Sequence, residues 1–300
     1  VVGTWQRRGA PPAQELRRHV EGGADLGLDR VPQAAAEVFQ LDRLAADQDQ
    51  FPRQPAEQLG GGQHFLEAGL VQAHLLGAHK ARHLGAFDDA GVTTSCVVVH
   101  EGRQYLYYTG WSLGVSVPFY LYAGLVVSDD DGESFQRVSR GPLLDRNDVD
   151  PYLTASPWVI VDNGRWRMWY VSGTEWNDGP SGVRHRYHVR YAESANGVDW
   201  QRDGVVCLDY ASPTEYAFGR PCVVKDADRY RMWYSVRGER YRMGYAESVD
   251  GVTWTRQDDV NVVQPSAEGW DSEMVTYPVV HGPIGRRVML YNGNDYGRSG

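Results

Sequence analysis

The stretch "YRMGYAESVDGVTW" at residues 241–254 nearly repeats "YHVRYAESANGVDW" at residues 187–200, fifty-four residues earlier in the chain. Two copies of so irregular a stretch are not expected by chance, and they indicate an internal repeat. Each copy is typical of a strand that ends in a glycine turn and is followed by a tryptophan. The repeat is therefore the first guide to the fold.

Other strands recur together with this stretch, and each copy follows a predicted hairpin. The second strand of the hairpin has four versions: "RQYLYY" (103–108), "RWRMWY" (165–170), "RYRMWY" (229–234) and "RRVMLY" (286–291). Its first strand is short and apolar: "SCVVV" (95–99), "SPWVIV" (156–161), "RPCVVK" (220–225) and "YPVVH" (277–281). Turns that contain Gly or Asp join each pair, which predicts β-hairpins.

The recurring unit is thus a four-stranded antiparallel sheet, and "LYAGLVVS" (121–128) supplies its third strand in the first copy. Repeated four-stranded units rich in aromatic residues are typical of a β-propeller, whereas a β-sandwich has no reason to repeat its sequence. We predict blades at about 87–140, 148–204 and 213–258, and a partial blade at 270–300. An incomplete ring exposes strand edges. Either the chain is truncated, or its first 84 residues supply the missing part.

Residues 1–84 differ in composition from the rest of the chain. All eighteen tyrosines lie at Tyr105 or later, while the first 84 residues are rich in Ala, Leu, Gln and Glu. Such a composition favours helix, so we predict two or three short helices or disorder in an atypical segment at 1–84. The propeller domain is expected at 85–300.

Composition also limits the partners and the location. A net charge of −9 argues against a nucleic-acid or anionic-membrane partner. No apolar run approaches the roughly 18 residues of a membrane span, and the N-terminus shows no secretory signal pattern, which favours the cytoplasm. Cys96, Cys207 and Cys222 lack metal-ligand spacing and are expected to be buried free thiols. No cofactor is predicted, and the sequence does not indicate an oligomeric state.

Two sets of acids fall on opposite faces of the propeller, because the strands of a blade alternate in direction. The turns between the third and fourth strands, with Asp131, Asn196 and Asp250, lie on the far face and resemble the stabilising Asp-boxes of sialidases. The loops that enter each first strand lie on the near face and carry acids at similar positions: Asp89, Asp150, Glu215, Asp271 and Glu273.

Aromatic, amide and arginine side chains accompany the near-face acids: Trp111, Trp176, Tyr152, Tyr216, Arg220, Arg237 and Asn292. Aromatic faces pack on sugar rings, while carboxylates, amides and Arg bind hydroxyl groups, so the set predicts a carbohydrate site. Cleavage of a glycoside needs two carboxyl groups, one protonated and one ionised. Two alternatives stay open: the acids cap the strand-entry loops, or they bind a structural calcium ion in the funnel.

These motifs resemble those of the five-bladed β-propeller glycosidases of the arabinanase, levansucrase and invertase superfamily, over about residues 85–300. That superfamily includes glycoside hydrolase families forty-three and thirty-two, and mannoside phosphorylases are related to it. The resemblance implies five blades and three catalytic acids: Asp89 as base or nucleophile, Asp150 as supporting aspartate and Glu215 as proton donor. Tyr216 and Phe218 beside Glu215 are expected to raise its pKa.

Three functions are compatible with this sequence. The first is a glycoside hydrolase, or a related phosphorylase, that uses carboxylates in the central funnel. The second is a propeller that binds a carbohydrate without cleaving it, and the third is an accessory module in polysaccharide biosynthesis. A sialidase is disfavoured, because it needs three arginines on the funnel face and only Arg220 and Arg237 are placed there.

Overall fold

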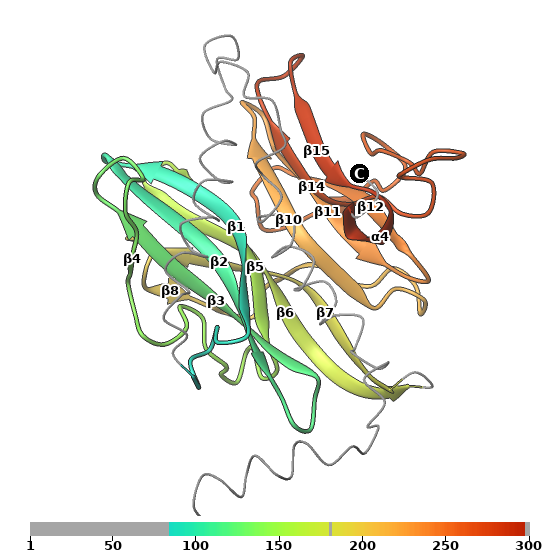
Figure 1. Ribbon diagram of the computed structural model, residues 1–300. Helices are drawn as coiled ribbons and strands as arrows, with labels where there is room; N and C mark the ends of the chain where they lie inside the picture. Colours follow the sequence, from blue (N-terminus) through green and yellow to red (C-terminus); the bar gives the residue numbers. More distant parts are fainter. Residues whose placement is uncertain (1–83, 180–181, 298–300) are drawn as a thin grey trace, which may run out of the picture.

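The computed structural model describes residues 84–179 and 182–297 (Figure 1). Nearly all of the regular structure in these ranges is strand, as the repeat predicts. The helices expected in residues 1–84 lie outside the described residues, apart from the turn at Leu84. Within the described ranges, no helix is long and apolar enough to cross a membrane.

The first blade is a four-stranded antiparallel sheet whose strands pair in chain order. Its strands are β1 (Gly91–His100), β2 (Arg103–Leu113), β3 (Phe119–Ser128) and β4 (Gln136–Arg137). The sequences "SCVVV", "RQYLYY" and "LYAGLVVS" occupy the first three strands, in the predicted order.

The second and third blades repeat this arrangement. The second contains β5 (Thr154–Asp162), β6 (Arg165–Gly179), β7 (Gly182–Ser194) and β8 (Trp200–Gln201). The third contains β10 (Ala217–Lys225), β11 (Tyr230–Arg237), β12 (Tyr241–Ser248) and β13 (Thr255–Arg256). One parallel pairing, Ala217 with Tyr187, joins the two blades into a continuous sheet. The strand β9 (Val206–Leu208), which the sequence did not predict, pairs with β7.

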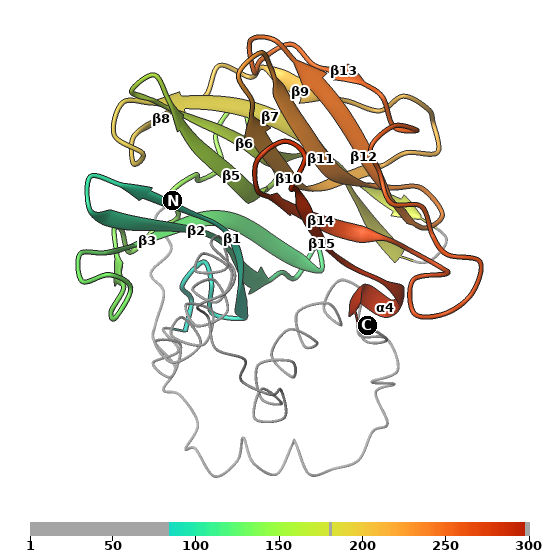
Figure 2. The ribbon, with the colours of Figure 1, turned by 90° about the horizontal axis from the view of Figure 1, so that it is seen from above.

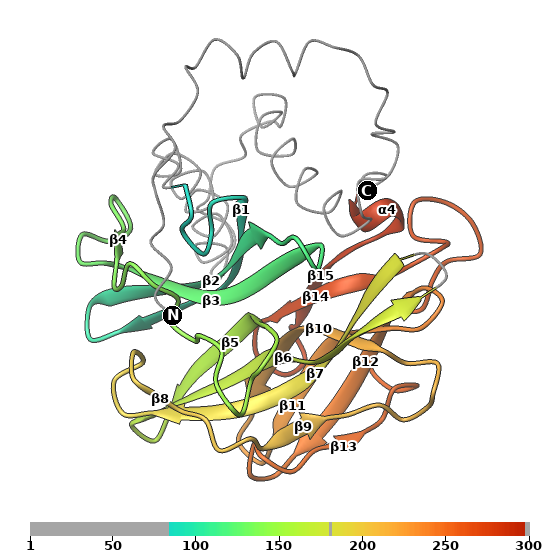
Figure 3. The ribbon, with the colours of Figure 1, turned by 90° about the horizontal axis from the view of Figure 1, so that it is seen from below.

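The fourth sheet is the two-stranded pair of β14 (Thr276–His281) and β15 (Val288–Asn292). The short turn α4 (Asn294–Gly297) follows it. Asp295 and Tyr296 have φ values of 52° and 59° there, so the turn is not a right-handed helix. Figures 2 and 3 show the sheets side by side about a common centre, and the first strands β1, β5, β10 and β14 contact one another in that order. This is the architecture of a β-propeller.

Aromatic and apolar side chains fill the space between neighbouring blades. Tyr107 of the first blade packs with Met168 and Trp166 of the second, and Trp169 of the second packs with Phe218 and other residues of the third. Between the third and fourth sheets the core is built from Cys222, Trp233, Tyr245 and Val280. Cys207 and Cys222 are buried free thiols as predicted, and Cys96 is free and half-buried.

The far-face turns fasten each blade to the next. In the third blade Asp250 Oδ1 accepts the N–H groups of Val252 and Thr253, each at 2.8 Å. The carbonyl oxygen of Gly251 accepts the indole N–H of Trp169 from the second blade at 2.8 Å. These turns stabilise the fold, as the sequence indicates.

One detail of the turn prediction was wrong. In the first blade Asp130, not Asp131, accepts the Ser134 N–H at 2.9 Å and so takes the place of Asp250. Asp131 has a φ of 55° and lies one position further along the turn. The serine two residues before Asp130 fixes the alignment, because Ser128 Oγ donates to Asp130 Oδ1 at 2.7 Å, as Ser248 does to Asp250 at 2.8 Å.

Candidate functional site in the axial pocket

A β-bulge interrupts the innermost strand of each of the four described sheets at the same point. The register shifts lie between Thr94 and Cys96, Ala155 and Trp158, Gly219 and Cys222, and Thr276 and Val279. Within them, Ser156, Arg220 and Tyr277 have φ values of 46°, 45° and 55°, which residues with side chains seldom adopt. Bulges and strained backbone of this kind gather at functional sites, where they redirect side chains.

The bulge residues Ser156, Arg220 and Tyr277 line a pocket near the centre of the propeller. It has an empty volume of about 810 Å³, part of it open to solvent. All four sheets and the turn α4 contribute to its walls: Thr93, Thr109, Trp111, Leu121, Ala155, Ser156, Val171, Tyr187, Gly219, Arg220, Tyr241, Tyr277, Asn292 and Tyr296. We call this the axial pocket. Five of its residues are aromatic and several others carry hydroxyl, amide or guanidinium groups.

The polar groups of the axial pocket are held in place by neighbours. Arg220 Nη2 donates a hydrogen bond to the carbonyl oxygen of Thr94 in the first blade, and the guanidinium lies 5.6 Å from the ring centre of Tyr277. Burial lowers the pKa of Arg220, which still leaves an arginine charged at neutral pH. Asn292 Nδ2 donates to the carbonyl oxygen of Tyr296 at 3.0 Å. The Trp111 indole N–H donates to Thr93 Oγ1 at 3.2 Å.

A second group of aromatic and cationic side chains lies beside the pocket. The Arg237 guanidinium lies 5.0 Å from the ring centre of Tyr241, which lines the pocket, and 5.6 Å from that of Tyr216. His185 stacks on Tyr187 and touches Trp176 edge-on. Burial lowers the pKa of His185 to about 3, with the charges of Arg237 and Arg184 adding to the effect, so this imidazole is neutral at pH 7.

The predicted supporting acid, Asp150, does not line the axial pocket. It is fully buried within the second blade. Its carboxylate accepts hydrogen bonds from the Tyr170 hydroxyl at 3.0 Å, from Ser172 Oγ at 2.6 Å and from Arg202 Nη1 at 2.8 Å. These contacts tie the entry loop to β6 and to the residue that follows β8.

The same arrangement recurs in the first blade and in the fourth sheet. Asp88 accepts from the Tyr108 hydroxyl at 3.1 Å, and Asp271 accepts from the Tyr291 hydroxyl at 2.8 Å. In all three cases acid and tyrosine are twenty residues apart. The structural counterpart of Asp150 in the first blade is therefore Asp88. The predicted base Asp89 is half-buried in a separate hollow, where it accepts the Gly85 N–H at 2.9 Å.

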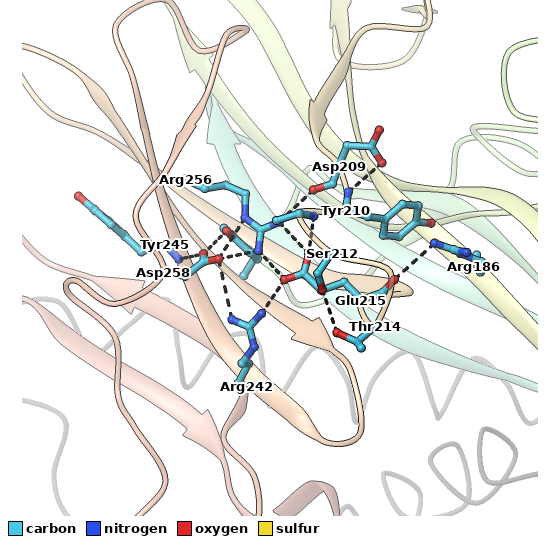
Figure 4. A network of polar contacts seen from close by, with 12 residues as sticks. Arg186, Asp209, Tyr210, Ser212, Thr214, Glu215, Arg242, Tyr245, Arg256 and Asp258 are labelled. Atoms are coloured by element: carbon cyan, nitrogen blue, oxygen red, sulfur yellow. Dashed lines mark hydrogen bonds and ion pairs between the residues drawn. The ribbon is translucent and has the colours of Figure 1, made fainter.

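Glu215, the predicted proton donor, occupies a dense polar network in the third blade (Figure 4). It is almost completely buried and receives hydrogen bonds from Arg256 at 2.8 Å, from Arg242 at 2.5 Å and from the Ala211 N–H at 2.8 Å. Burial would raise the pKa of Glu215, but the hydrogen bonds from Arg256 and Ala211 and the arginine charges outweigh it and lower the pKa. The expectation of a raised pKa was wrong, because the sequence did not reveal the two arginines.

The remaining predicted residues divide between the pocket and the surface. Trp111, Arg220 and Asn292 line the axial pocket, and Trp176, Tyr216 and Arg237 belong to the group beside it. Tyr152 is 37% exposed, and Glu273 lies on the surface with its carboxylate 3.6 Å from Arg240. Neither residue lines the pocket.

Sequence reasoning missed several pocket residues: Ser156, Tyr187, Tyr241, Tyr277 and Tyr296. A usable signal was present, because Ser156, Arg220 and Tyr277 each directly precede a proline at the start of an apolar strand. A proline within a strand favours an edge or a bulge, and the residue beside it is the one turned toward the axis. Among the described residues no three His, Cys, Asp or Glu side chains gather where they could hold a metal ion. A structural calcium ion stays a prediction.

Solved structures with the same architecture define the class of fold. A glycoside hydrolase has a TM-score of 0.56 at 19% identity, covering 73% of this chain and 70% of its own. A thermostable family-43 glycoside hydrolase has a TM-score of 0.54 at 19% identity, covering 68% and 66%. A GH32 β-fructofuranosidase of Bombyx mori, in complex with sucrose, has 0.51 at 16%, covering 66% and 42%. The chain has the β-propeller fold of these glycosidases, which confirms the resemblance.

The sequence relatives are more similar than these structures. The proteins MT1551 and Rv1502, from two strains of Mycobacterium tuberculosis and both described as uncharacterized, are each 41% identical over 216 residues, covering 72% of this chain and 71% of theirs. The chain belongs to the family of Rv1502. No protein-family model matches the chain.

Proposed function

We propose that the protein binds a carbohydrate in the axial pocket. The observation that carries this proposal is the convergence of five aromatic rings with the guanidinium of Arg220, the amide of Asn292 and threonine and serine hydroxyls in one concave site. Aromatic faces pack against the C–H faces of sugar rings, and the polar groups meet the hydroxyls. Concave sites with few, fixed polar groups are typical of small-ligand binding.

Glycosidase activity, hydrolytic or phosphorolytic, is the second candidate, and the shared fold with glycoside hydrolases favours it. Its predicted acids are Asp89, Asp150 and Glu215. A proton donor must hold its proton near neutral pH, whereas the arginines around Glu215 keep this carboxylate ionised. Asp150 is likewise bound to Arg202. Among the described residues, binding of a sugar is therefore better supported than its cleavage.

The decisive experiment combines a binding screen with an activity screen. Purified protein is applied to an array of glycans, and hits are measured by calorimetry for the wild type, Trp111→Ala and Tyr152→Ala. We expect Trp111→Ala to weaken binding by about tenfold or more, since aromatic contact is lost, and Tyr152→Ala to bind like the wild type. Absence of binding to every glycan would refute the proposal.

The activity screen tests the second candidate on the same protein. Aryl-glycosides are supplied with and without phosphate, and turnover is followed for the wild type and for Glu215→Gln. Turnover that Glu215→Gln abolishes, in a variant that folds and still binds sugar, would establish the catalytic assignment. If no aryl-glycoside is turned over while glycans bind, the protein is a carbohydrate-binding propeller.

We also propose that a fifth blade closes the ring between the first blade and the fourth sheet. A hollow there is lined by apolar residues of both sides, among them Val97, Val279 and Leu290. Val99, Val288 and Leu290 are each about half exposed, whereas a closed propeller leaves no such apolar strand edge. If the gap is covered in solution, Val99→Asp will lower the melting temperature by several degrees. An unchanged melting temperature would contradict closure.

A further inference from the structure

We propose that the sugar in the axial pocket is acidic, and that its carboxylate or phosphate group binds the guanidinium of Arg220. This inference rests on the proposed carbohydrate-binding function and names the class of its ligand.

Arg220 is the one cation among the equivalent bulge positions of the four described sheets. The first, second and fourth sheets have Ser95, Ser156 and Tyr277 there, all uncharged. Arg220 holds a left-handed backbone with a φ of 45°, which costs free energy in a residue with a side chain. The fold thus tolerates both strained backbone and a half-buried charge at this position, where Arg220 lines the axial pocket.

The surroundings of Arg220 differ from those of the arginines within the blades. Arg137, Arg202 and Arg256 each make an ion pair with a buried acid: Asp88 at 2.7 Å, Asp150 at 2.8 Å and Glu215 at 2.8 Å. Arg220 instead meets the Thr94 carbonyl oxygen and the Tyr277 ring, and in residues 84–179 and 182–297 no carboxylate forms an ion pair with it.

Taking a charge partly out of water is costly unless an opposite charge compensates it. A guanidinium has five N–H donors in a planar fork that matches the two oxygens of a carboxylate or the oxygens of a phosphate. The Thr94 carbonyl takes one of these groups. A ligand anion in the pocket would bring both the missing charge and acceptors for the remaining donors.

Two further arginines, Arg237 and Arg184, lie beside the pocket, although the whole chain carries −9. Arg237 lies behind the Tyr241 wall, and together with Arg184 it lowers the pKa of His185, after burial, which is the larger cause. Of the acids nearby, Glu175 has a cationic neighbour of its own, since it lies 3.4 Å from Arg186. Local positive potential favours an anion whatever the net charge of the protein.

The rest of the pocket selects a sugar rather than a bare anion. Trp111, Tyr187 and Tyr241 offer aromatic surface, and Asn292 and Thr109 offer groups that bind hydroxyls. Inorganic phosphate or chloride would use the guanidinium but leave the aromatic surface in water. A sugar that carries a carboxylate or a phosphate would use both.

The test compares acidic sugars with neutral ones of the same shape. Binding of D-glucuronate, its methyl ester, D-glucose, D-glucose 6-phosphate and inorganic phosphate is measured by calorimetry or ligand-observed NMR. The variants are Arg220→Met, Arg220→Lys and, as a matched control, Arg165→Met, whose guanidinium is 60% exposed and pairs with Glu193 far from the axis. Thermal unfolding shows which variants are folded.

We expect at least one acidic sugar to bind about 10- to 100-fold more tightly than the ester and glucose, as charge-assisted hydrogen bonds imply. Arg220→Met should remove that preference, Arg220→Lys should retain part of it, and Arg165→Met should leave it unchanged. The comparison of acid with ester in the wild type stands even if Arg220→Met does not fold.

The outcomes separate this inference from the function on which it rests. If neutral and acidic sugars bind equally, carbohydrate binding stands and the acidic ligand is refuted. If inorganic phosphate binds as tightly as glucose 6-phosphate, the site is an anion site without sugar recognition, which also overturns the inference. If no sugar in this set or on the glycan array binds, the proposed function itself fails.

Discussion

The entry loops of the blades and the axial pocket lie only a few residues apart in the sequence, yet their polar groups differ. The entry loops hold carboxylates, whereas the pocket is lined by hydroxyl, amide and guanidinium groups. Asp150 in the entry loop is buried and ion-paired to Arg202 inside its own blade. Six residues further on, Ser156 belongs to the bulge that lines the pocket. The comparison teaches that an acid such as Asp150, which looks catalytic in the sequence, is bound by side chains of its own blade, whereas the bulge residues line the pocket that we propose as the binding site.

The largest effect is expected at Asp150. Asp150→Ala removes a buried carboxylate and leaves Arg202 without its partner, which costs about 3–5 kcal/mol for a buried ion pair. Chemical denaturation should therefore show a large loss in the free energy of unfolding. Asp203→Ala, at an exposed aspartate one residue beyond Arg202, is the control and should change little. A variant at Asp150 with wild-type stability but no glycan turnover would show that this acid is catalytic after all.

The sequence predicted the repeat and the order of the strands, because both follow from periodic apolar and aromatic residues. It did not predict what the acids bind. Arg202 lies 52 residues after Asp150, and Arg256 lies 41 after Glu215, so these pairs form only once the fourth strand of a blade returns to its entry loop. A loop considered alone therefore shows an unpaired acid.

Several residues of the pocket were not predicted, for a different reason. A bulge adds one residue to a strand, and this single step decides whether a side chain faces a neighbouring blade or the axis. Trp111 and Arg220 were predicted because they lie close to strand ends on the near face, whereas Tyr187 and Tyr241 belong to the third strands β7 and β12 and were assigned to the fold alone. The extra strand β9 has no sequence repeat at all.

The second effect, at Glu215, depends on pH. The pKa of Glu215 is lowered in the folded protein from its usual value of 4.5. Its contribution to stability is therefore complete above pH 4.5, and it is lost as the pH falls through the pKa that Glu215 has in the folded protein. Glu215→Gln should lower the free energy of unfolding by about 1–3 kcal/mol at pH 7, as for hydrogen bonds to charged groups. Because the variant lacks the titrating group, its difference from the wild type should shrink below pH 4.5.

A pH-dependent difference of this kind would indicate that the carboxylate of Glu215 stabilises the entry loop, in contrast to the residues of the axial pocket. Arg242→Gln removes one of the arginines around Glu215 and serves as a partner variant, with a smaller expected loss since Arg256 still binds the carboxylate. A difference between wild type and Glu215→Gln that stays constant from pH 7 to pH 3 would contradict the ionised, structural carboxylate.

The third effect has the opposite sign and lies in the pocket. Ser156 has a φ of 46°, a backbone conformation that glycine adopts without steric cost because it lacks a Cβ atom. Ser156→Gly should therefore raise the free energy of unfolding by about 0.5–1 kcal/mol. The hydrogen bond from the Ser156 N–H to Thr109 Oγ1, at 2.8 Å, is kept. Ala155→Gly, one residue earlier in an ordinary strand conformation, should lower stability. Destabilisation by both substitutions would show that the bulge is not strained.

The smallest effect is expected on the far face, at Asp250. Burial raises its pKa, but the N–H groups of Thr253 and Val252 outweigh this and lower the pKa to about 2. Asp250→Ala removes the acceptor and should lower the melting temperature slightly, less than any change at Asp150, since the side chain is exposed and screened. Asp250→Asn should be tolerated at pH 7, because Asn196 performs the same task in the second blade, where its Oδ1 accepts two N–H groups at 2.9 Å. Calorimetry of the two variants decides the point. If Asn is as harmful as Ala, the negative charge rather than the acceptor geometry holds the turn, and the equivalence of the far-face turns is refuted.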